Sequence, residues 1–266
     1  MSETFALSEI MSDAMPKTVT QTSFRDRIGA GPGGGYYPAP RRYHLYLSPG
    51  CPRSLRISIT LGLLGLENSV GTTLLPSSAR ARDALAALRT AYETTRHHYD
   101  GPPTVPALCD LWSGRIVNNH TPDILDDLAL RLTDQDNVDL PRLRPAALAA
   151  DIDAVRELLG EDLARDPALD SALDLLERQL ASYPYALGET LTAADVDLWV
   201  ALVHLDADAL RRVTAVDRLW SYVRRLGAHP AFHKIPREHS GEDLCSPLKD
   251  KDRAADQSRV TVPAGH

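Results

Sequence analysis

The sequence has few cysteines, no excess of positive charge and no long apolar run. Its three cysteines, Cys51, Cys109 and Cys245, are too few and too scattered for a disulfide framework, and no Cys-x-x-Cys pair or Cys/His zinc spacing occurs. We therefore expect reduced thiols and no metal. The formal net charge of −7 removes the broad positive field that binding to phosphate backbones needs, which argues against a nucleic-acid partner.

Signals for membrane insertion and secretion are also missing. No apolar run reaches the roughly 18 residues that a membrane-spanning helix needs. The start, MSETFALSEIMSDAMPKT, has no basic end followed by an apolar block. We expect a cytoplasmic protein without a membrane partner.

Residues 1–40 are polar and then rich in glycine, ending in GAGPGGGYYPAP. Such a composition buries too little apolar surface to offset the entropy lost on ordering. We expect a flexible N-terminal segment over these residues.

Residues 41–132 carry alternating strand and helix signals. Apolar alternation predicts a strand over residues 43–47, whereas the segment after Cys51 fits two periods, with apolar residues at every second position and also at intervals of three or four. Because Pro52 suits a first helical turn, we predict a helix there. A strand over 69–75, a helix over 79–94 with Leu85, Leu88 and Tyr92 on one face, a hairpin of 104–110 with 115–119, and a helix from Thr121 follow.

Residues 145–235 read as helix throughout, after the proline-punctuated connection NVDLPRLRP. Apolar stripes of helical spacing run through them. In LTAADV, Thr192 is a candidate N-cap with Asp195 three residues later, and the apolar run to Leu205 predicts a central buried helix. A further helix is expected over 216–226, and residues 236–266 lack periodicity and are expected to form an irregular tail.

Four motifs in this order resemble a known superfamily. They are RYHLYLSPGCP followed by LGLLGLE, YDGPPTVPALCDLWSGRIVNN, LGETLTAADVDLW with HLD after it, and the closing SRVTVPAGH. Over about residues 40–235 the chain resembles a glutathione transferase, and within that superfamily the Xi class, the glutathionyl-hydroquinone reductases. The resemblance implies an α/β plus all-α fold, with a thioredoxin-like N-terminal domain followed by a helical-bundle C-terminal domain.

The resemblance also implies roles for individual residues. Cys51 would attack the sulfur of a glutathionyl adduct, release the reduced quinol and form a mixed disulfide that a second thiol resolves. Val105 would give backbone hydrogen bonds to the bound tripeptide, and Pro106 would be cis. A homodimer is expected from the superfamily, with glutathione or another low-molecular-weight thiol as co-substrate and a small hydrophobic or quinone-like molecule as substrate.

The position of Cys51 supports a reactive thiol independently of the resemblance. A cysteine at a helix start lies near the positive end of the helix dipole and near unpaired amide groups, which favour the thiolate. Arg53 adds positive charge, as would Arg56 if it faces the thiol. Arg53 also lies at the expected mouth of the site, where it could meet an anionic substrate. The alternative is that Cys51 is a buried, unreactive cysteine; Cys109, inside an apolar strand, is expected to be core.

The chain departs from the class at both binding subsites. Arg53 and Ser54 follow Cys-Pro where the class has Trp-Ala, and His120 and Thr121 follow Asn119 where the class has Glu-Ser. Thr121 keeps a hydroxyl, but His120 cannot supply the carboxylate that pairs with the γ-glutamyl ammonium group. The class's substrate-facing tyrosines have no evident counterparts; Trp199 and His204 are candidates for the far wall of the substrate pocket, although both residue types are usually core on so apolar a helix.

Three hypotheses follow from a retained nucleophile with altered subsites. The chain is a thiol-dependent enzyme that uses a thiol without a γ-glutamyl ammonium group, a glutathionyl-hydroquinone reductase that tolerates the changes, or a non-catalytic binding or scaffold protein of the same fold. Within the first, a thiolate at this position also suits isomerisation or dehalogenation. Reactivity of Cys51 separates the third hypothesis from the other two.

Overall fold

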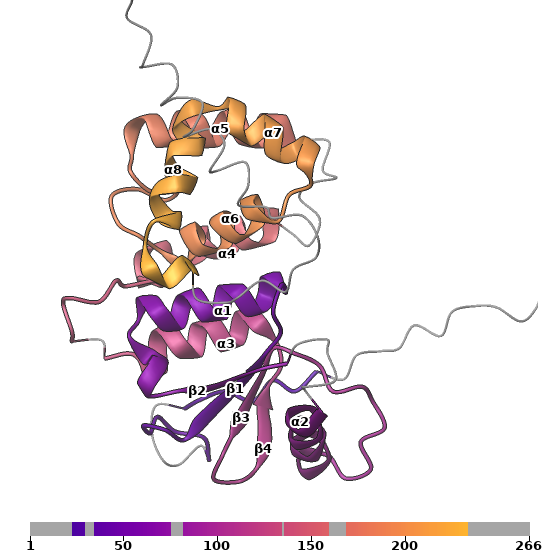
Figure 1. The fold of residues 1–266 in the computed structure, drawn as a ribbon. Coiled ribbons are helices and arrows are strands. Elements are labelled where there is room, and N and C mark those ends of the chain that lie inside the picture. The colour runs from indigo at the N-terminus through magenta and orange to yellow at the C-terminus, as the bar shows by residue number, and fades with distance from the viewer. Residues whose placement is uncertain (1–22, 30–34, 76–81, 135, 160–168, 234–266) are drawn as a thin grey trace, which may run out of the picture.

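The computed structural model describes residues 23–29, 35–75, 82–134, 136–159 and 169–233 (Figure 1). Within them, a sheet half is followed by a helical half, and the end of the chain expected as an irregular tail, from residue 236, lies outside the described residues. No helix in the described part of the chain is both long and apolar enough to cross a membrane.

The sheet half is built on four strands in the order β2-β1-β3-β4. These are β1 (Tyr43–Leu47), β2 (Gly71–Leu74), β3 (Ala107–Asp110) and β4 (Arg115–Asn118). Strand β1 pairs in parallel with β2 and antiparallel with β3, and β3 pairs antiparallel with β4. The strands and the β3–β4 hairpin confirm the sequence prediction, and the mixed sheet matches a thioredoxin-like arrangement.

Helices cover both faces of this sheet. Helices α1 (Pro52–Leu63) and α3 (Thr121–Asp127) lie on the face toward the helical half, and α2 (Arg82–Thr95) lies on the other face (Figure 1). The alternation along β1 divides the core accordingly, because Leu45 and Leu47 pack with the α1 side whereas Tyr46 packs with the α2 side.

The helix predicted after Cys51 is confirmed as α1, and its burial explains the ambiguous pattern. Ile57, Ile59 and Leu61 are all buried, although a helix resting on one surface would bury a single stripe. Helix α1 instead packs between the sheet and the helical half, where it contacts α6 (Ala193–Val203) and the 3₁₀ helix Pro230–His233. A helix covered on two sides carries apolar residues at strand-like as well as helical spacing.

Helix α2 differs in one detail from the prediction. Leu88 and Tyr92 are buried, but Leu85 is 44% exposed. Ala84 packs at the start of the buried stripe instead, four residues before Leu88. The face that contacts the sheet is thus turned by one residue from the predicted one.

The N-terminal segment, residues 23–29, corrects the prediction that all of residues 1–40 are flexible. It lies along the outer edge of β4, where the Asp26 N–H donates to the Val117 carbonyl at 3.0 Å and the Asn119 N–H donates to the Phe24 carbonyl at 3.0 Å. Ile28 within it is only 1% exposed. The prediction failed because these partners lie more than ninety residues away in the chain; residues 1–22 and 30–34 lie outside the described residues.

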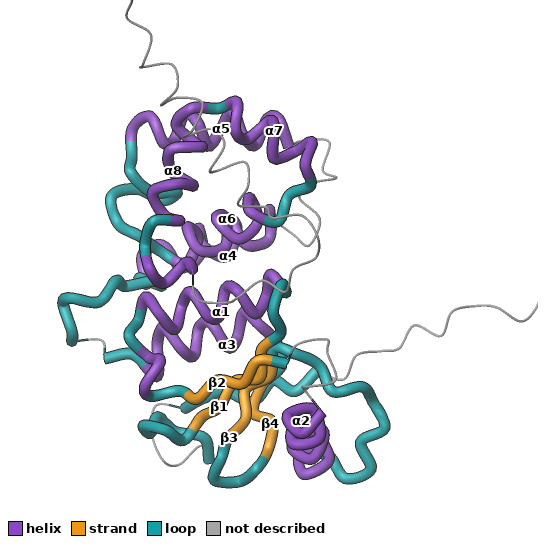
Figure 2. The backbone as a smooth tube through the Cα atoms, viewed as in Figure 1, coloured by secondary structure: helices purple, strands orange, loops and turns teal. Residues whose placement is uncertain are grey.

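The helical half contains α4 (Ala149–Leu159), α5 (Leu169–Ser182), α6, α7 (Ala207–Ala215) and α8 (Asp217–Gly227) (Figure 2). A π-helix (Leu128–Leu132) and a 3₁₀ helix (Ala146–Leu148) precede them. Helix α6 is buried and central, as predicted, and the Asp195 carboxylate accepts the Thr192 N–H at 2.8 Å at its start. Helix α7 was not predicted separately; the Asp206 side chain caps it by accepting the Ala209 N–H at 2.8 Å.

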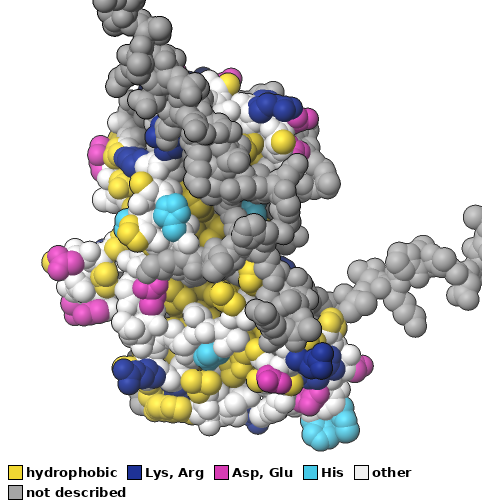
Figure 3. Space-filling model, in the orientation of Figure 1, with side chains coloured by type: hydrophobic (Ala, Val, Ile, Leu, Met, Phe, Trp, Pro, Cys, Tyr) yellow, Lys and Arg dark blue, Asp and Glu magenta, His cyan; other side chains and the backbone are white. Residues whose placement is uncertain are grey.

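On the face shown in Figure 3, hydrophobic side chains appear at the junction of the two halves. Basic and acidic side chains are interspersed on that face, with no large patch of one sign among the described residues.

Candidate functional site

Cys51 is the N-cap residue of α1, immediately after the loop that follows β1. Its backbone is extended, with φ −83° and ψ 119°, and its carbonyl accepts the Leu55 N–H at 2.9 Å. Pro52 occupies the first helical position, where no amide donor is needed. The thiol is partly exposed, so a small molecule can reach it at the amino end of the helix.

Local hydrogen bonds favour the thiolate of Cys51. Burial raises the pKa of this thiol, but hydrogen bonds from the backbone and side chain of Ser54 and of Arg53 outweigh burial and lower the pKa below its ordinary value. Ser54 is itself fully buried, and its Oγ accepts the Ser48 N–H at 3.0 Å. In the sequence, Ser54 stood out only because the class has alanine at this position, and its role as a hydrogen-bond donor to Cys51 was missed. A hydroxyl three residues after a cysteine at a helix start is the signal that could have revealed it.

Arg56 does not add its charge to the thiol. Its Nε lies 3.2 Å from the Asp197 carboxylate on α6, and Arg156 of α4 lies 3.0 Å from the other oxygen of that carboxylate. Asp197 is almost fully buried. Arg56 therefore ties α1 to the helical half, and the positive side chain beside Cys51 is that of Arg53.

The other described cysteine is inert by comparison. Cys109 lies in β3 and is 3% exposed. Burial, together with the nearby Asp110 carboxylate, raises the pKa of its thiol to about 11. Cys109 is therefore core, as predicted, and Cys245 lies outside the described residues.

The Val105–Pro106 peptide bond is cis, as the resemblance implied. Ala107 pairs with Tyr46 near the end of β1. The Val105–Pro106 peptide therefore lies at the same end of the sheet as the loop that leads from β1 to Cys51. Strand β4 runs antiparallel to β3, so it ends where β3 begins and leads from there into His120. The topology thus brings Cys51, Val105–Pro106 and the start of α3 to the same end of the sheet.

His120 and Thr121 begin α3. His120 is the N-cap residue, its N–H donates to Asn118 Oδ1 at 2.7 Å, and its Nδ1 lies 3.3 Å from Asp123 Oδ1. Thr121 is the first helical residue and is largely buried. The side chain of His120 remains partly exposed and faces a carboxylate of its own helix.

Asp123 is not available to pair with a ligand ammonium group. The Arg25 guanidinium donates to both of its oxygens, at 2.8 and 2.9 Å, and Arg27 approaches within 3.5 Å. Burial raises the pKa of Asp123, but hydrogen bonds from Arg25 and Asn118 and the charges around it lower that pKa to about 2. In the described part of the chain, His120 thus lies near Arg25 and Arg27 of the N-terminal segment, whose partners Asp123 and Asp127 on α3 are buried.

Comparison with known proteins agrees with this architecture. The profile of the glutathione S-transferase C-terminal domain family matches residues 145–225. The glutathionyl-hydroquinone reductase PcpF of Sphingobium chlorophenolicum is 29% identical over 239 residues, which are 73% of this chain and 74% of that protein. The chain is thus similar to glutathione transferases, and the profile match lies in its helical half.

Solved transferase structures share the fold. A glutathione transferase from Gordonia bronchialis has 28% identity and a TM-score of 0.68, with 79% of this chain and 78% of that one covered. The Xi transferase from Phanerochaete chrysosporium has 27% identity and a TM-score of 0.66, with 81% and 87% covered. The likeness to Xi-class transferases confirms the thioredoxin-like and helical halves expected from the sequence.

Trp199 of α6 is buried, and His204 at the end of this helix is partly buried. The Trp199 indole N–H donates to the Val223 carbonyl at 3.0 Å, and its ring packs against Phe232 with 5.0 Å between centroids. His204 Nδ1 lies 2.8 Å from the Val200 carbonyl at the end of α6. Both side chains thus have partners within the helical half, and a place in the wall of the substrate pocket stays a prediction for each.

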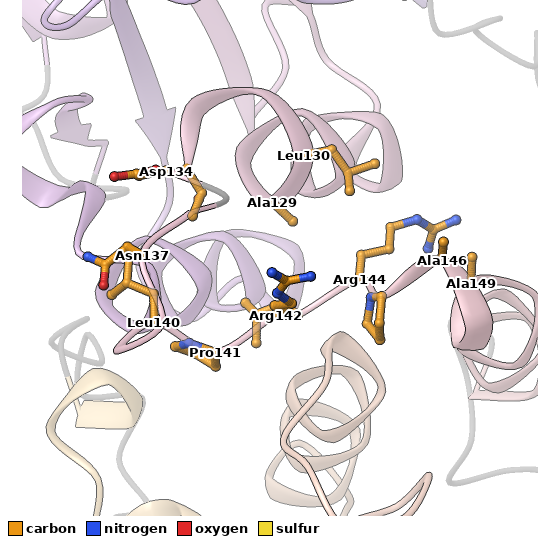
Figure 4. Close-up of a pocket in the computed structure, with 13 residues that line it drawn as sticks. Ala129, Leu130, Asp134, Asn137, Leu140, Pro141, Arg142, Arg144, Ala146 and Ala149 are labelled. Carbon is orange, nitrogen blue, oxygen red and sulfur yellow. The ribbon is translucent and has the colours of Figure 1, made fainter.

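A cavity of about 450 Å³ lies beside the connection between the two halves (Figure 4). Its wall includes apolar side chains of the π-helix and the connection, and the guanidinium groups of Arg142 and Arg144 project among them. Arg144 is held by Asp126 at 3.3 Å and Asp153 at 2.8 Å. Cys51 is not among the lining residues, so this cavity is separate from the thiol. Nor do the described residues hold a group of three or more His, Cys, Asp or Glu side chains that could bind a metal.

Proposed function

We propose that this transferase is a thiol-dependent reductase in which Cys51 is the nucleophile. The Cys51 thiolate attacks the sulfur of a conjugate between a thiol and a quinol. A sulfur–sulfur bond forms, the carbon–sulfur bond breaks, and the aromatic carbon takes up a proton, so that the quinol leaves in reduced form. A second thiol then attacks the mixed disulfide, releases the disulfide of the small thiol and regenerates Cys51.

The observation that carries the proposal is the contrast between the two described cysteines. Cys51 caps a helix, is reachable and has a lowered pKa, whereas Cys109 is buried with its pKa raised to about 11. The thiolate is the attacking species, so this contrast selects Cys51. Cys109 is buried and carries a raised pKa, which argues against it as the resolving thiol, and a second small thiol from solution is proposed for that step.

The relatives support the substrate class. Two proteins at 29% and 27% identity are named glutathionyl-hydroquinone reductases, from Sphingobium chlorophenolicum and from Escherichia coli. A quinone-type conjugate is therefore the first substrate to test. A homodimer and a cytoplasmic location are proposed with it, as is usual for the superfamily.

The start of α3 suggests which thiol is used. Glutathione carries an α-ammonium group that needs a carboxylate partner, and the described carboxylates there, Asp123 and Asp127, are held by Arg25 and Arg27. His120 stands where the class has glutamate. We propose that the protein accepts glutathione weakly and prefers a thiol whose corresponding end is uncharged or anionic.

Intact-mass spectrometry after exposure to the oxidised forms of several low-molecular-weight thiols, glutathione among them, tests the nucleophile. A single adduct is expected, lost in Cys51→Ala and kept in the control Cys109→Ala. Cys51→Ala should also abolish turnover of a thiol–quinol conjugate with a nearly unchanged melting temperature. Retained turnover in Cys51→Ala would refute the mechanism, and no adduct with any thiol would favour a non-catalytic binding protein.

Replacement of His120 tests the thiol subsite. A charge-assisted hydrogen bond contributes about 1.5–3 kcal/mol, or about one to two decades in affinity. His120→Glu is therefore expected to lower the Kd for glutathione by about tenfold or more, with His120→Gln, which adds no charge, as the matched control. Unchanged or weaker binding by the glutamate variant would contradict this account of the subsite.

A further inference from the structure

Asn119 joins three segments that are far apart in the chain. Its Oδ1 accepts the Phe24 N–H of the N-terminal segment at 2.8 Å. Its Nδ2 donates to the Tyr92 hydroxyl of α2 at 3.3 Å and to Thr104 Oγ1 at 3.2 Å. One side chain thus links the edge of the sheet, the helix behind it and the residue before Val105–Pro106.

The connection to Thr104 is made twice. The Tyr92 hydroxyl donates to the Thr104 carbonyl at 3.0 Å and lies 2.9 Å from Thr104 Oγ1. Tyr92 is fully buried, and Phe24 packs edge-on against its ring at 5.4 Å between centroids. The position of Thr104 therefore depends on groups that are themselves rigidly held.

Asn119 lies between the two parts of the thiol subsite. Residues 104–106, the cis-proline loop, are on one side of it, and His120 at the start of α3 follows it directly. The Asn119 backbone N–H is bonded to the Phe24 carbonyl, so the residue is fixed at both main chain and side chain. A shift of Asn119 would change the distance between the loop and α3, and with it the fit of a thiol bound by both.

We propose that Asn119 is a positioning residue that sets the cis-proline loop against the start of α3, and that the N-terminal segment is thereby part of the thiol-binding machinery. The inference rests on the proposed function, because it takes the cis-proline loop and the start of α3 to be the parts of the protein that bind the thiol. Cys51 lies on α1 and takes its hydrogen bonds from Ser54 and Arg53, so its reactivity does not depend on Asn119.

Steady-state kinetics with a thiol–quinol conjugate separate positioning from chemistry. Asn119→Ala should raise the KM for the resolving thiol about tenfold or more, since lost hydrogen bonds and a misplaced subsite both weaken binding. The kcat should change less than about threefold, and the pH profile of Cys51 alkylation should not move. A lower kcat with unchanged KM, or a displaced alkylation profile, would overturn the proposal.

Milder variants keep the test valid if Asn119→Ala does not fold. Tyr92→Phe and Thr104→Val each delete one partner and should raise KM in the same direction, whereas Thr104→Ser keeps the hydroxyl and should restore the native value. Thr90→Val is the matched control, since the Thr90 hydroxyl is exposed and bonds only within its own helix at Ala86. A KM that is unaffected by both Tyr92→Phe and Thr104→Val would refute the assignment.

Hydrogen exchange distinguishes failure of this inference from failure of the proposed function. In Asn119→Ala, amides of the N-terminal segment and of the cis-proline loop should exchange faster than in wild type, and in Thr90→Val they should not. If Asn119→Ala exchanges faster but the wild-type protein turns over no thiol–quinol conjugate, the proposed function fails and the coupling stands. Unchanged exchange in Asn119→Ala would overturn the coupling itself.

Discussion

Ser54→Ala should make the Cys51 thiol harder to ionise. Ser54 is fully buried, and its hydroxyl makes two hydrogen bonds. Its oxygen accepts the Ser48 N–H at 3.0 Å, and its donated hydrogen bond lowers the pKa of Cys51. Alanine removes both contacts. The hydrogen bonds from Arg53 and from the backbone of residue 54 remain, so the pKa should rise without reverting fully.

The size of the effect follows from the lost hydrogen bond. A hydrogen bond to a charged group contributes about 1.5–3 kcal/mol, so the thiolate fraction below the pKa falls by about tenfold to a hundredfold. The thiolate that remains is more basic and therefore more nucleophilic, with a Brønsted coefficient of about 0.4–0.5. The net rate of attack on a disulfide at a pH below the pKa should fall about threefold to tenfold.

The assay is the rate of reaction of Cys51 with an aromatic disulfide probe from about pH 5 to pH 9. Ser54→Ala should shift the midpoint of this profile upward, while Ser58→Ala, on the same helix, should leave it in place. The Ser48 N–H also loses its acceptor, so chemical denaturation should reveal a loss of about 1–3 kcal/mol in the free energy of unfolding. A midpoint that does not move would refute the argument that the Ser54 hydroxyl favours the thiolate.

Two further predictions concern buried carboxylates. Asp123 has its pKa lowered to about 2, so its contribution is full above its ordinary pKa of about 4 and is lost as the pH falls toward 2. Asp123→Asn should therefore cost about 2 kcal/mol of unfolding free energy at pH 7 and little at pH 2, and a cost independent of pH would contradict the role of Arg25. Asp197→Asn leaves Arg56 and Arg156 without their shared counter-charge and should cost about 3 kcal/mol in urea denaturation, whereas a cost below about 1 kcal/mol would disprove it.

Local patterns predicted much of the fold. The alternation in β1, Pro52 at the first position of α1, and Thr192 with Asp195 at the start of α6 each specify structure through neighbours a few residues away. Such signals act within one element, and the structure confirms all three. The placement of Cys51 at a helix start follows from the same local chemistry.

Features that depend on distant partners were predicted less well. The N-terminal segment looks too polar to order itself, but Arg25 and Ile28 within it meet Asp123 and Asp127 of α3. The partner of the buried Trp199 indole, the Val223 carbonyl of α8, likewise lies on another helix. In each case the deciding group lies on another element, and no local period reports it.

The sequence by itself determined most of the order of elements and the placement of Cys51 at a helix start, because helix caps, proline and apolar periods act over short distances. Only the tertiary structure decided which charges remain available. Arg56 is paired with Asp197 and Asp123 is held by Arg25, whereas Arg53 stays beside the thiol and is exposed. The physical reason is that a side chain's charge is balanced by whichever partner the packing of α1, α3 and α6 brings within a few ångströms, and that packing is a property of the whole chain.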